Sequence, residues 1–111
     1  MITDTSVLEA FLEVPRELFI NTSYQDQSYA DHPLPIGSGQ TISQPTTVML
    51  MLQLLDVQPG QRVLEIGAGC GYNAALLAQL AGEVVTVERH AVLAELARDN
   101  LRKADQEKVK I

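Results

Sequence analysis

The sequence contains, at residues 63–72, the segment Val63-Leu64-Glu65-Ile66-Gly67-Ala68-Gly69-Cys70-Gly71-Tyr72. A short apolar run that breaks into alternating glycines is typical of a buried strand that enters a tight turn. The residues that follow, 73–81, are predicted to form a helix. Glycines at such a turn let the main chain approach a ligand closely, because a Cβ atom would occupy that space. The segment therefore predicts a strand–turn–helix unit with a ligand site at the turn.

A second apolar run, Val84-Val85-Thr86-Val87, ends in Glu88. The carboxylate of Glu88 can accept hydrogen bonds from both hydroxyl groups of a ribose, as an acidic residue about 20 positions after the glycine turn does in dinucleotide-binding folds. Its offset from Gly67 fits this role. We therefore expect a nucleoside-containing ligand, although the glycines alone would also be explained by a sharp strand-to-helix connection.

The glycine spacing and a second carboxylate distinguish two classes of ligand. In the dinucleotide fingerprint G-x-G-x-x-G the third glycine stands one place later than Gly71, where this chain has Tyr72. Glu65, just before the turn, suits a cationic ligand better than a pyrophosphate. Since S-adenosylmethionine carries a sulfonium and an ammonium group, we predict it as the cofactor. A nicotinamide-binding module is the less fitting alternative.

Length, charge and cysteine content limit the remaining classes of protein. A chain of 111 residues is one domain at most. No apolar run of about 18 residues could span a bilayer, and a formal net charge of −6 opposes nonspecific binding to nucleic acid. The single Cys70 cannot form an internal disulfide, and the N-terminus does not resemble a secretory leader. We therefore expect a cytoplasmic protein without membrane or nucleic-acid partners.

Capping residues, prolines and hydrophobic periodicity predict the remaining elements. In chain order these are a short helix capped by Thr5 or Ser6, a turn of helix from Pro15, an ordered irregular loop over residues 21–44, a helix from Pro45 to about Leu55 capped by Ser43, and an amphipathic helix after Glu88. Val109-Lys110-Ile111 is predicted to open a third strand, and the charges of alternating sign before it indicate a solvated helix face. Alternating strands and helices indicate an α/β fold with parallel strands, which bind ligands at their carboxyl ends.

Three further segments carry a resemblance to a known family. They read Val14-Pro15-Arg16-Glu17-Leu18-Phe19, Tyr29-Ala30-Asp31 and Leu34-Pro35-Ile36-Gly37-Ser38-Gly39-Gln40-Thr41-Ile42-Ser43-Gln44-Pro45. Together with the glycine turn they resemble the protein-L-isoaspartate O-methyltransferases, from roughly Val7 to the C-terminus. The resemblance implies a Rossmann-like, doubly wound α/β sheet that binds S-adenosylmethionine. It also implies methylation of the free carboxylate of L-isoaspartyl residues in damaged proteins and peptides, a repair reaction.

The resemblance also assigns roles to single residues. Ser43 matches the hydroxyl position regarded as the active-site residue, although a serine before a helix-initiating proline is equally explained by capping. The cofactor contacts implied are Gln40, Thr41, Ile42, Glu65, Gly67, Gly69, Glu88 and Arg89. His90 would border the adenine together with Arg89, unless the two are an exposed loop pair. His32 is interpreted as a loop residue, and no metal site is predicted.

The implied chemistry needs positioning more than acid–base catalysis. An isoaspartyl carboxylate is already ionised at neutral pH, and a sulfonium is already an activated methyl donor. No base has to create the nucleophile. Ser43 would therefore orient the reacting groups by hydrogen bonding and would not act as a covalent nucleophile.

Proteins of this family are about twice as long as this chain, which ends where its third strand opens. We therefore expect a single partial methyltransferase domain, with residues 1–44 as N-terminal helix and substrate and cofactor loop, and residues 45–111 as the start of the cofactor-binding sheet. A sheet of so few strands exposes an unpaired edge, so we also expect marginal stability or self-association. The alternative function is a noncatalytic cofactor-binding or interaction fragment of such an enzyme.

Overall fold

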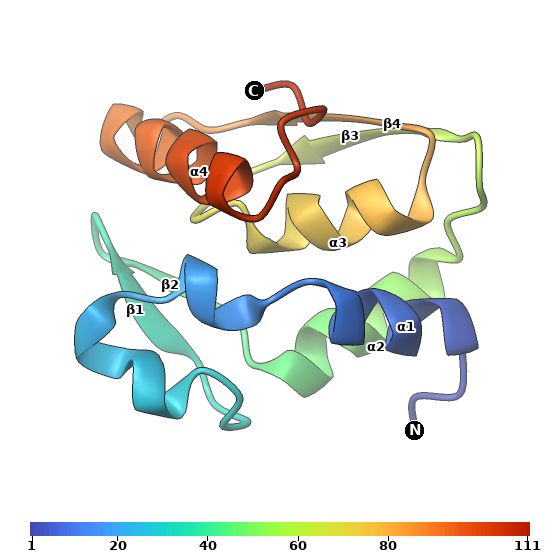
Figure 1. Ribbon diagram of the computed structural model, residues 1–111, viewed down its shortest axis with the longest axis horizontal. Coiled ribbons are helices and arrows are strands. Elements are labelled where there is room, and N and C mark those ends of the chain that lie inside the picture. Colours follow the sequence, from blue (N-terminus) through green and yellow to red (C-terminus); the bar gives the residue numbers. More distant parts are fainter.

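The sheet is built from two parallel strands, β3 (Arg62–Ile66) and β4 (Glu83–Val87), which pair in register along their whole length. The computed structural model describes residues 1–111. Helix α3 (Tyr72–Leu80) connects the two strands, and α4 (Ala91–Lys103) follows β4 (Figure 1). The predicted alternation of strands and helices is confirmed. The helix predicted over residues 73–81 begins and ends one residue earlier.

A third backbone segment lies beside β4. The N–H of Lys110 donates to the carbonyl oxygen of Val84 at 3.1 Å, and the N–H of Thr86 donates to that of Lys110 at 2.8 Å. These bonds form a parallel bridge between Val85 and Lys110, so the predicted opening of a third strand is confirmed. β4 therefore lies between this segment and β3. The edge of β3 that faces away from β4 pairs with no strand.

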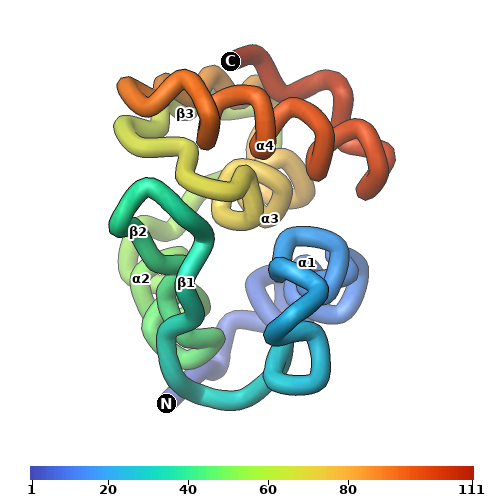
Figure 2. Tube along the Cα trace, turned by 90° about the vertical axis from the view of Figure 1, so that its left-hand side faces the viewer, coloured from blue at the N-terminus to red at the C-terminus, as the bar shows by residue number.

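The N-terminal part of the chain forms helices and a hairpin. Its elements are α1 (Thr5–Glu13), the 3-10 helices η1 (Arg16–Phe19) and η2 (Thr22–Gln27), β1 (Leu34–Gly37), β2 (Gln40–Ile42) and α2 (Pro45–Leu55). Figure 2 shows the antiparallel hairpin of β1 and β2 in front of α2, reaching up to the turn after β3. The predicted turn of helix at Pro15 and the helix over Pro45–Leu55 are both confirmed.

Two predictions for this part of the chain were wrong. The loop predicted as irregular over residues 21–44 contains η2 and the hairpin. The strands of that hairpin have three and four residues, which is too short to leave a sustained period-two pattern in the sequence. The cap of α1 is neither Thr5 nor Ser6 but Asp4, whose carboxylate accepts hydrogen bonds from the amides of Ser6 and Val7.

Helix α3 is the centre of a single apolar core. Every residue of α3 except Asn73 and Gln79 is buried, and α1, α4 and β4 all pack against it. The core cluster extends from Val7 on α1 to Val109 beside β4, and so joins the N-terminal part to the sheet. Because both parts bury their apolar surface in the same core, the hairpin is held in a defined place relative to the strand ends.

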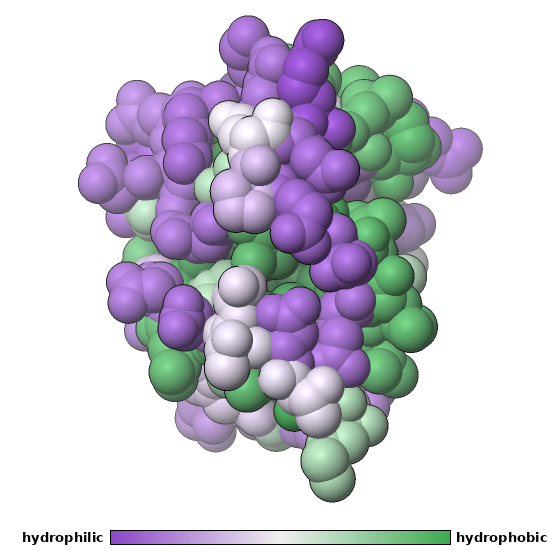
Figure 3. Space-filling view, turned by 90° about the vertical axis from the view of Figure 1, so that its right-hand side faces the viewer, coloured by the Kyte–Doolittle hydropathy of each residue, from purple (hydrophilic) through white to green (hydrophobic).

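One side of the molecule keeps an uncovered apolar surface. On the outer face of the sheet Leu64 and Ile66 are 63% and 77% exposed, and on α2 Met51 and Leu54 are 64% and 76% exposed. Figure 3 shows the apolar side chains gathered along one side of the molecule. None of the helices has the length and apolar character needed to cross a membrane.

We expect Gly71→Ala to destabilise the fold more than Gly60→Ala does. Both glycines have a positive φ, +93° and +88°, which costs an alanine roughly 1–2 kcal/mol. At Gly71 a Cβ atom would also lie 3.2 Å from the carbonyl oxygen of Ala97, whereas at Gly60 it would meet nothing within 4 Å. Such crowding adds about 1–3 kcal/mol. Urea unfolding of the two variants measures the difference, and equal midpoints would show that α4 can move away from the turn.

Candidate functional site

Two adjoining cavities lie at the carboxyl ends of β3 and β4. The inner cavity, about 350 Å³, lies between the turn after β3, the end of β2 and helix α2. The outer cavity, about 430 Å³, lies where β4 ends, and Gly67 lines both. Of the predicted site residues, Thr41, Ile42, Ser43, Glu65, Gly67 and Gly69 line the inner cavity, and Gln40, Gly67, Glu88 and Arg89 line the outer one. The fold therefore brings together all the residues that the sequence singled out.

Hydrogen bonds to the end of β4 hold the glycine turn. The N–H groups of Gly67 and Ala68 donate to the carbonyl oxygen of Val87 at 2.8 and 2.9 Å. The N–H of Gly69 donates to Oε1 of Glu88 at 2.9 Å, and Oε2 of Glu88 accepts from the N–H of His90 at 3.0 Å. Each oxygen of this carboxylate accepts one bond, so lone pairs remain for a ligand that donates from two hydroxyl groups. The amides of His90 and Gly69 also hold the pKa of Glu88 below its usual range.

Glu65 is held in a different environment on the inner cavity. Its carboxylate accepts hydrogen bonds from Asn73 Nδ2 at 2.7 Å and from Thr86 Oγ1 at 2.6 Å. Burial nevertheless raises the pKa of Glu65, the two hydrogen bonds lower it, and the charge of Glu88 raises it further. A cationic group in the inner cavity would stabilise the ionised form. Sequence reasoning did not single out Asn73 or Thr86. Pairing the two predicted strands in parallel and in register would have identified Thr86, because it lies opposite Glu65.

The capping role predicted for Ser43 was wrong. The residue at the N-cap of α2 is Gln44, and the N–H of Thr46 donates to Oδ1 of Asp31 at 2.9 Å. This bond also holds the pKa of Asp31 below its ordinary value. Ser43 is an exposed residue that lines the inner cavity. No local pattern would have identified Asp31, because it caps a helix that begins well after it in the chain.

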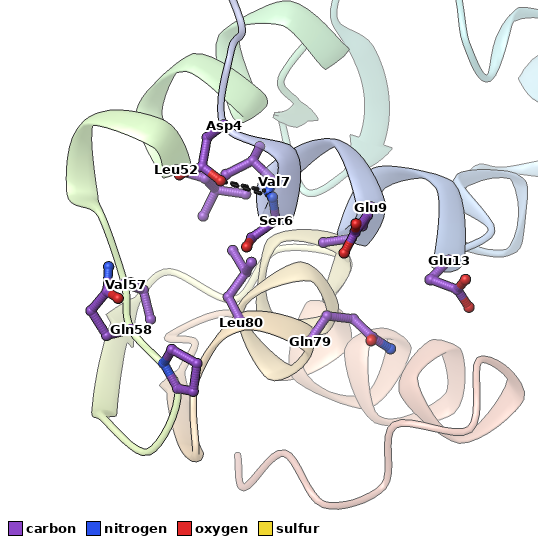
Figure 4. A pocket seen from close by; sticks show the side chains of 12 residues that line it. Asp4, Ser6, Val7, Glu9, Glu13, Leu52, Val57, Gln58, Gln79 and Leu80 are labelled. Carbon is purple, nitrogen blue, oxygen red and sulfur yellow. Dashed lines mark hydrogen bonds between the residues drawn. The ribbon is translucent and has the colours of Figure 1, made fainter.

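A third hollow, about 290 Å³, lies between α1 and the residues that lead into β3. None of the predicted site residues lines it. Figure 4 shows the carboxylate of Asp4 at its rim turned onto the first turn of α1, where it caps the helix. This hollow has carboxylates of its own, from Asp4, Glu9 and Glu13, but it lacks the glycine turn that lines the other two cavities. No cluster of three or more His, Cys, Asp or Glu side chains in the chain could hold a metal ion.

Comparison with known proteins identifies close relatives over the whole chain. The family model described as Protein-L-isoaspartate(D-aspartate) O-methyltransferase matches residues 1–111. A protein-L-isoaspartate O-methyltransferase of Methanoregula boonei is 56% identical over 99% of this chain and 51% of its own length. One of Aeropyrum pernix is also 56% identical, over 93% of this chain and 41% of its own. The chain spans about half the length of the curated relatives it matches.

Solved structures give the same result. A protein-L-isoaspartate O-methyltransferase superposes with a TM-score of 0.85 at 36% identity, over 98% of this chain and 37% of the other. A candidate protein-L-isoaspartate O-methyltransferase of Plasmodium falciparum, in complex with S-adenosyl-L-homocysteine, superposes with a TM-score of 0.85 at 27% identity. That match covers 99% of this chain and 55% of the other. The expected Rossmann-like methyltransferase fold is therefore confirmed.

The contacts of Glu88 predict how the glycine turn responds to pH. The amide proton shifts of Gly69 and His90 should titrate together, with a midpoint below the ordinary glutamate pKa of about 4.3, since both amides stabilise the ionised carboxylate. These bonds are complete above that range and weaken as the pH falls through the midpoint. Proton NMR measures both shifts, and Glu88→Gln should abolish the titration. Separate midpoints for the two amides would contradict a shared carboxylate.

Proposed function

Since this chain belongs to the protein-L-isoaspartate(D-aspartate) O-methyltransferase family, we propose that it serves the S-adenosylmethionine-dependent methylation of the free carboxylate of L-isoaspartyl residues in damaged proteins and peptides. The observation that carries this proposal is the meeting of the glycine turn, Glu88 and Ser43 around two adjoining cavities. Isoaspartyl-containing proteins or peptides are the partners. The cytoplasmic location and the lack of nucleic-acid and membrane partners stay predictions from the sequence.

The residues of both cavities fit an adenosyl cofactor with an amino-acid tail. Glu65 would attract the ammonium group, while Gly67 and Gly69 leave room for the main chain to approach the ligand. Glu88 would accept from the ribose hydroxyls, and Gln40 and Arg89 would border the outer part of the nucleoside. Thr41 and Ile42 close the inner cavity from the hairpin. The relative from Plasmodium falciparum, with its bound S-adenosyl-L-homocysteine, supports this assignment.

Ser43 performs the positioning step. The bound cofactor supplies a methyl group that is already activated by the sulfonium. The acceptor carboxylate is ionised at neutral pH, so no residue of the chain has to remove a proton. The Ser43 hydroxyl donates a hydrogen bond that orients the acceptor carboxylate in the inner cavity. Orientation of this kind is a large source of rate enhancement in transfers between two bound groups.

The alternative function is a noncatalytic cofactor-binding or interaction fragment. It is favoured by the uncovered outer face of the sheet, where Leu64 and Ile66 are exposed. Residues 1–44, with the hairpin and Ser43, and residues 45–111, with the glycine turn and Glu88, would then bind the cofactor without turnover. Binding and turnover measured on the same sample distinguish this alternative from the enzyme.

We expect the chain to transfer a labelled methyl group from S-adenosylmethionine to an isoaspartyl peptide and not to the matching aspartyl peptide. Ser43→Ala should lower the rate by at least about tenfold, because the acceptor loses an orienting hydrogen bond. Ser23→Ala, on exposed η2, is the matched control and should leave the rate unchanged. Equal labelling of both peptides would reject the substrate assignment. Binding of S-adenosyl-L-homocysteine without any transfer would support the noncatalytic alternative.

The raised pKa of Glu65 predicts pH-dependent cofactor binding. The ammonium group of S-adenosyl-L-homocysteine would favour the ionised carboxylate and so lower the pKa that burial raises in the free protein. Affinity should therefore increase as the pH rises through the raised pKa and then level off, with protons released on binding below that point. Calorimetry at several pH values measures both effects, and Glu65→Gln should remove them. A pH profile that is the same in this variant would exclude Glu65 as the partner of the ammonium group.

We also propose that copies of the chain associate through the outer face and free edge of the sheet. The edge of β3 has backbone groups without a strand partner, and Leu64 and Ile66 beside it are exposed. Light scattering should show a dimer or larger species whose mass depends on concentration. Leu64→Glu should shift it towards monomer, whereas Leu12→Glu, on the exposed side of α1, should not. A monomer at all concentrations would contradict this proposal.

A further inference from the structure

Arg16 is a fully buried arginine close to the inner cavity. Its side chain, on η1, has no exposed surface. Nε donates to the carbonyl oxygen of Ser28 at 2.5 Å, and Nη2 donates to the carbonyl oxygen of Ser43 at 2.9 Å. The guanidinium carbon lies 4.8 Å from the centre of the Tyr72 ring. The guanidinium therefore connects the end of η2, Ser43 two residues before α2, and the start of α3.

This arrangement is not explained by stability alone. None of the salt bridges of the chain involves Arg16. Its Nη1 and the hydroxyl of Tyr72 are both buried without a hydrogen-bond partner. Burying a charge and leaving polar atoms unpaired both cost free energy, and an apolar side chain of similar volume often stabilises a core better. We therefore look for the role of Arg16 in its two directed hydrogen bonds.

One of these bonds, from Nη2, acts on the segment that carries Ser43. Arg16 holds the carbonyl oxygen of Ser43, and Asp31 holds the N–H of Thr46 three residues later. The backbone of residues 43–46 is thus fixed at both ends without use of the Ser43 hydroxyl. The ring of Tyr72, directly after the glycine turn, lies against the same guanidinium. One buried group therefore sets the position of Ser43 relative to the turn.

We propose that Arg16 is a positioning residue that holds the Ser43 hydroxyl in place at the inner cavity. The catalytic consequence rests on the proposed methyl transfer, whereas the structural consequence does not. A lysine keeps the positive charge but cannot direct two fixed hydrogen bonds to Ser28 and Ser43. Arg16→Lys therefore separates the directed bonds from the charge.

The experiment measures hydrogen exchange of the segment 41–47 in the full 111-residue chain, with Val7→Ala, at a buried position of α1, as the control of reduced stability. Arg16→Lys should speed exchange of this segment by at least about tenfold more than it speeds the rest of the chain. In Val7→Ala the segment should follow the global change. Arg16→Lys should also lower turnover of the isoaspartyl peptide by at least about tenfold and change the Kd of S-adenosyl-L-homocysteine by less than about twofold.

Two outcomes would overturn the proposal. One is that, at equal stability, segment 41–47 exchanges its amide hydrogens at the same rate in Arg16→Lys as in Val7→Ala. The other is unchanged turnover in Arg16→Lys. If the wild-type chain transfers no methyl group, the proposed function fails, but selective loosening of segment 41–47 still supports the placement of Ser43 by Arg16. A measurement on the wild type does not depend on how the variants fold: the guanidinium protons of Arg16 should exchange slowly, and fast exchange would contradict the two bonds.

Discussion

The site depends on one constraint, the attachment of the glycine turn to the end of β4. The main chain must reverse between β3 and α3 while its amides point at the carbonyl oxygen of Val87 and at Glu88. Positive φ angles at Gly67, Gly69 and Gly71 make this path possible, because other residues adopt such angles only at a cost. Asn100 of α4 completes the attachment by donating to the carbonyl oxygen of Cys70 at 3.0 Å.

The same attachment places two carboxylates, Glu65 and Glu88, at the two cavities. Glu65 and Glu88 stand at the ends of neighbouring strands, and their pKa values move in opposite directions. Glu65 is largely desolvated, whereas Glu88 is stabilised by two backbone amides. Two carboxylates beside one turn therefore suit two parts of one ligand, a cation and a pair of hydroxyl groups. The division arises from burial and hydrogen bonding and not from residue type.

How well a site residue can be predicted from the sequence depends on how far apart in the chain the residues that it contacts lie. Gly67, Gly69 and Glu88 belong to a strand–turn–helix–strand unit whose spacing is local, so the pattern alone indicated a ligand site. The family motif was needed to single out Ser43, which the local pattern alone interprets as a helix cap. Asp31 and Arg16 act on residues 15 and 27 positions later in the chain. No periodicity or spacing reports such contacts, because they form only once segments distant in the chain have packed together.

The sequence by itself determined the α/β alternation, the glycine turn, the helix from Pro45 and the family, because each depends on residue order over a short range or on a quoted motif. Tertiary structure alone decided that Asp31 and not Ser43 completes the start of α2, and that a buried Arg16 holds the Ser43 carbonyl. It also decided which apolar residues stay uncovered, with Leu64 and Ile66 exposed on β3. Hydrogen-bond partners and burial depend on which distant segments come into contact, and the packing of the other elements around α3 determines those contacts.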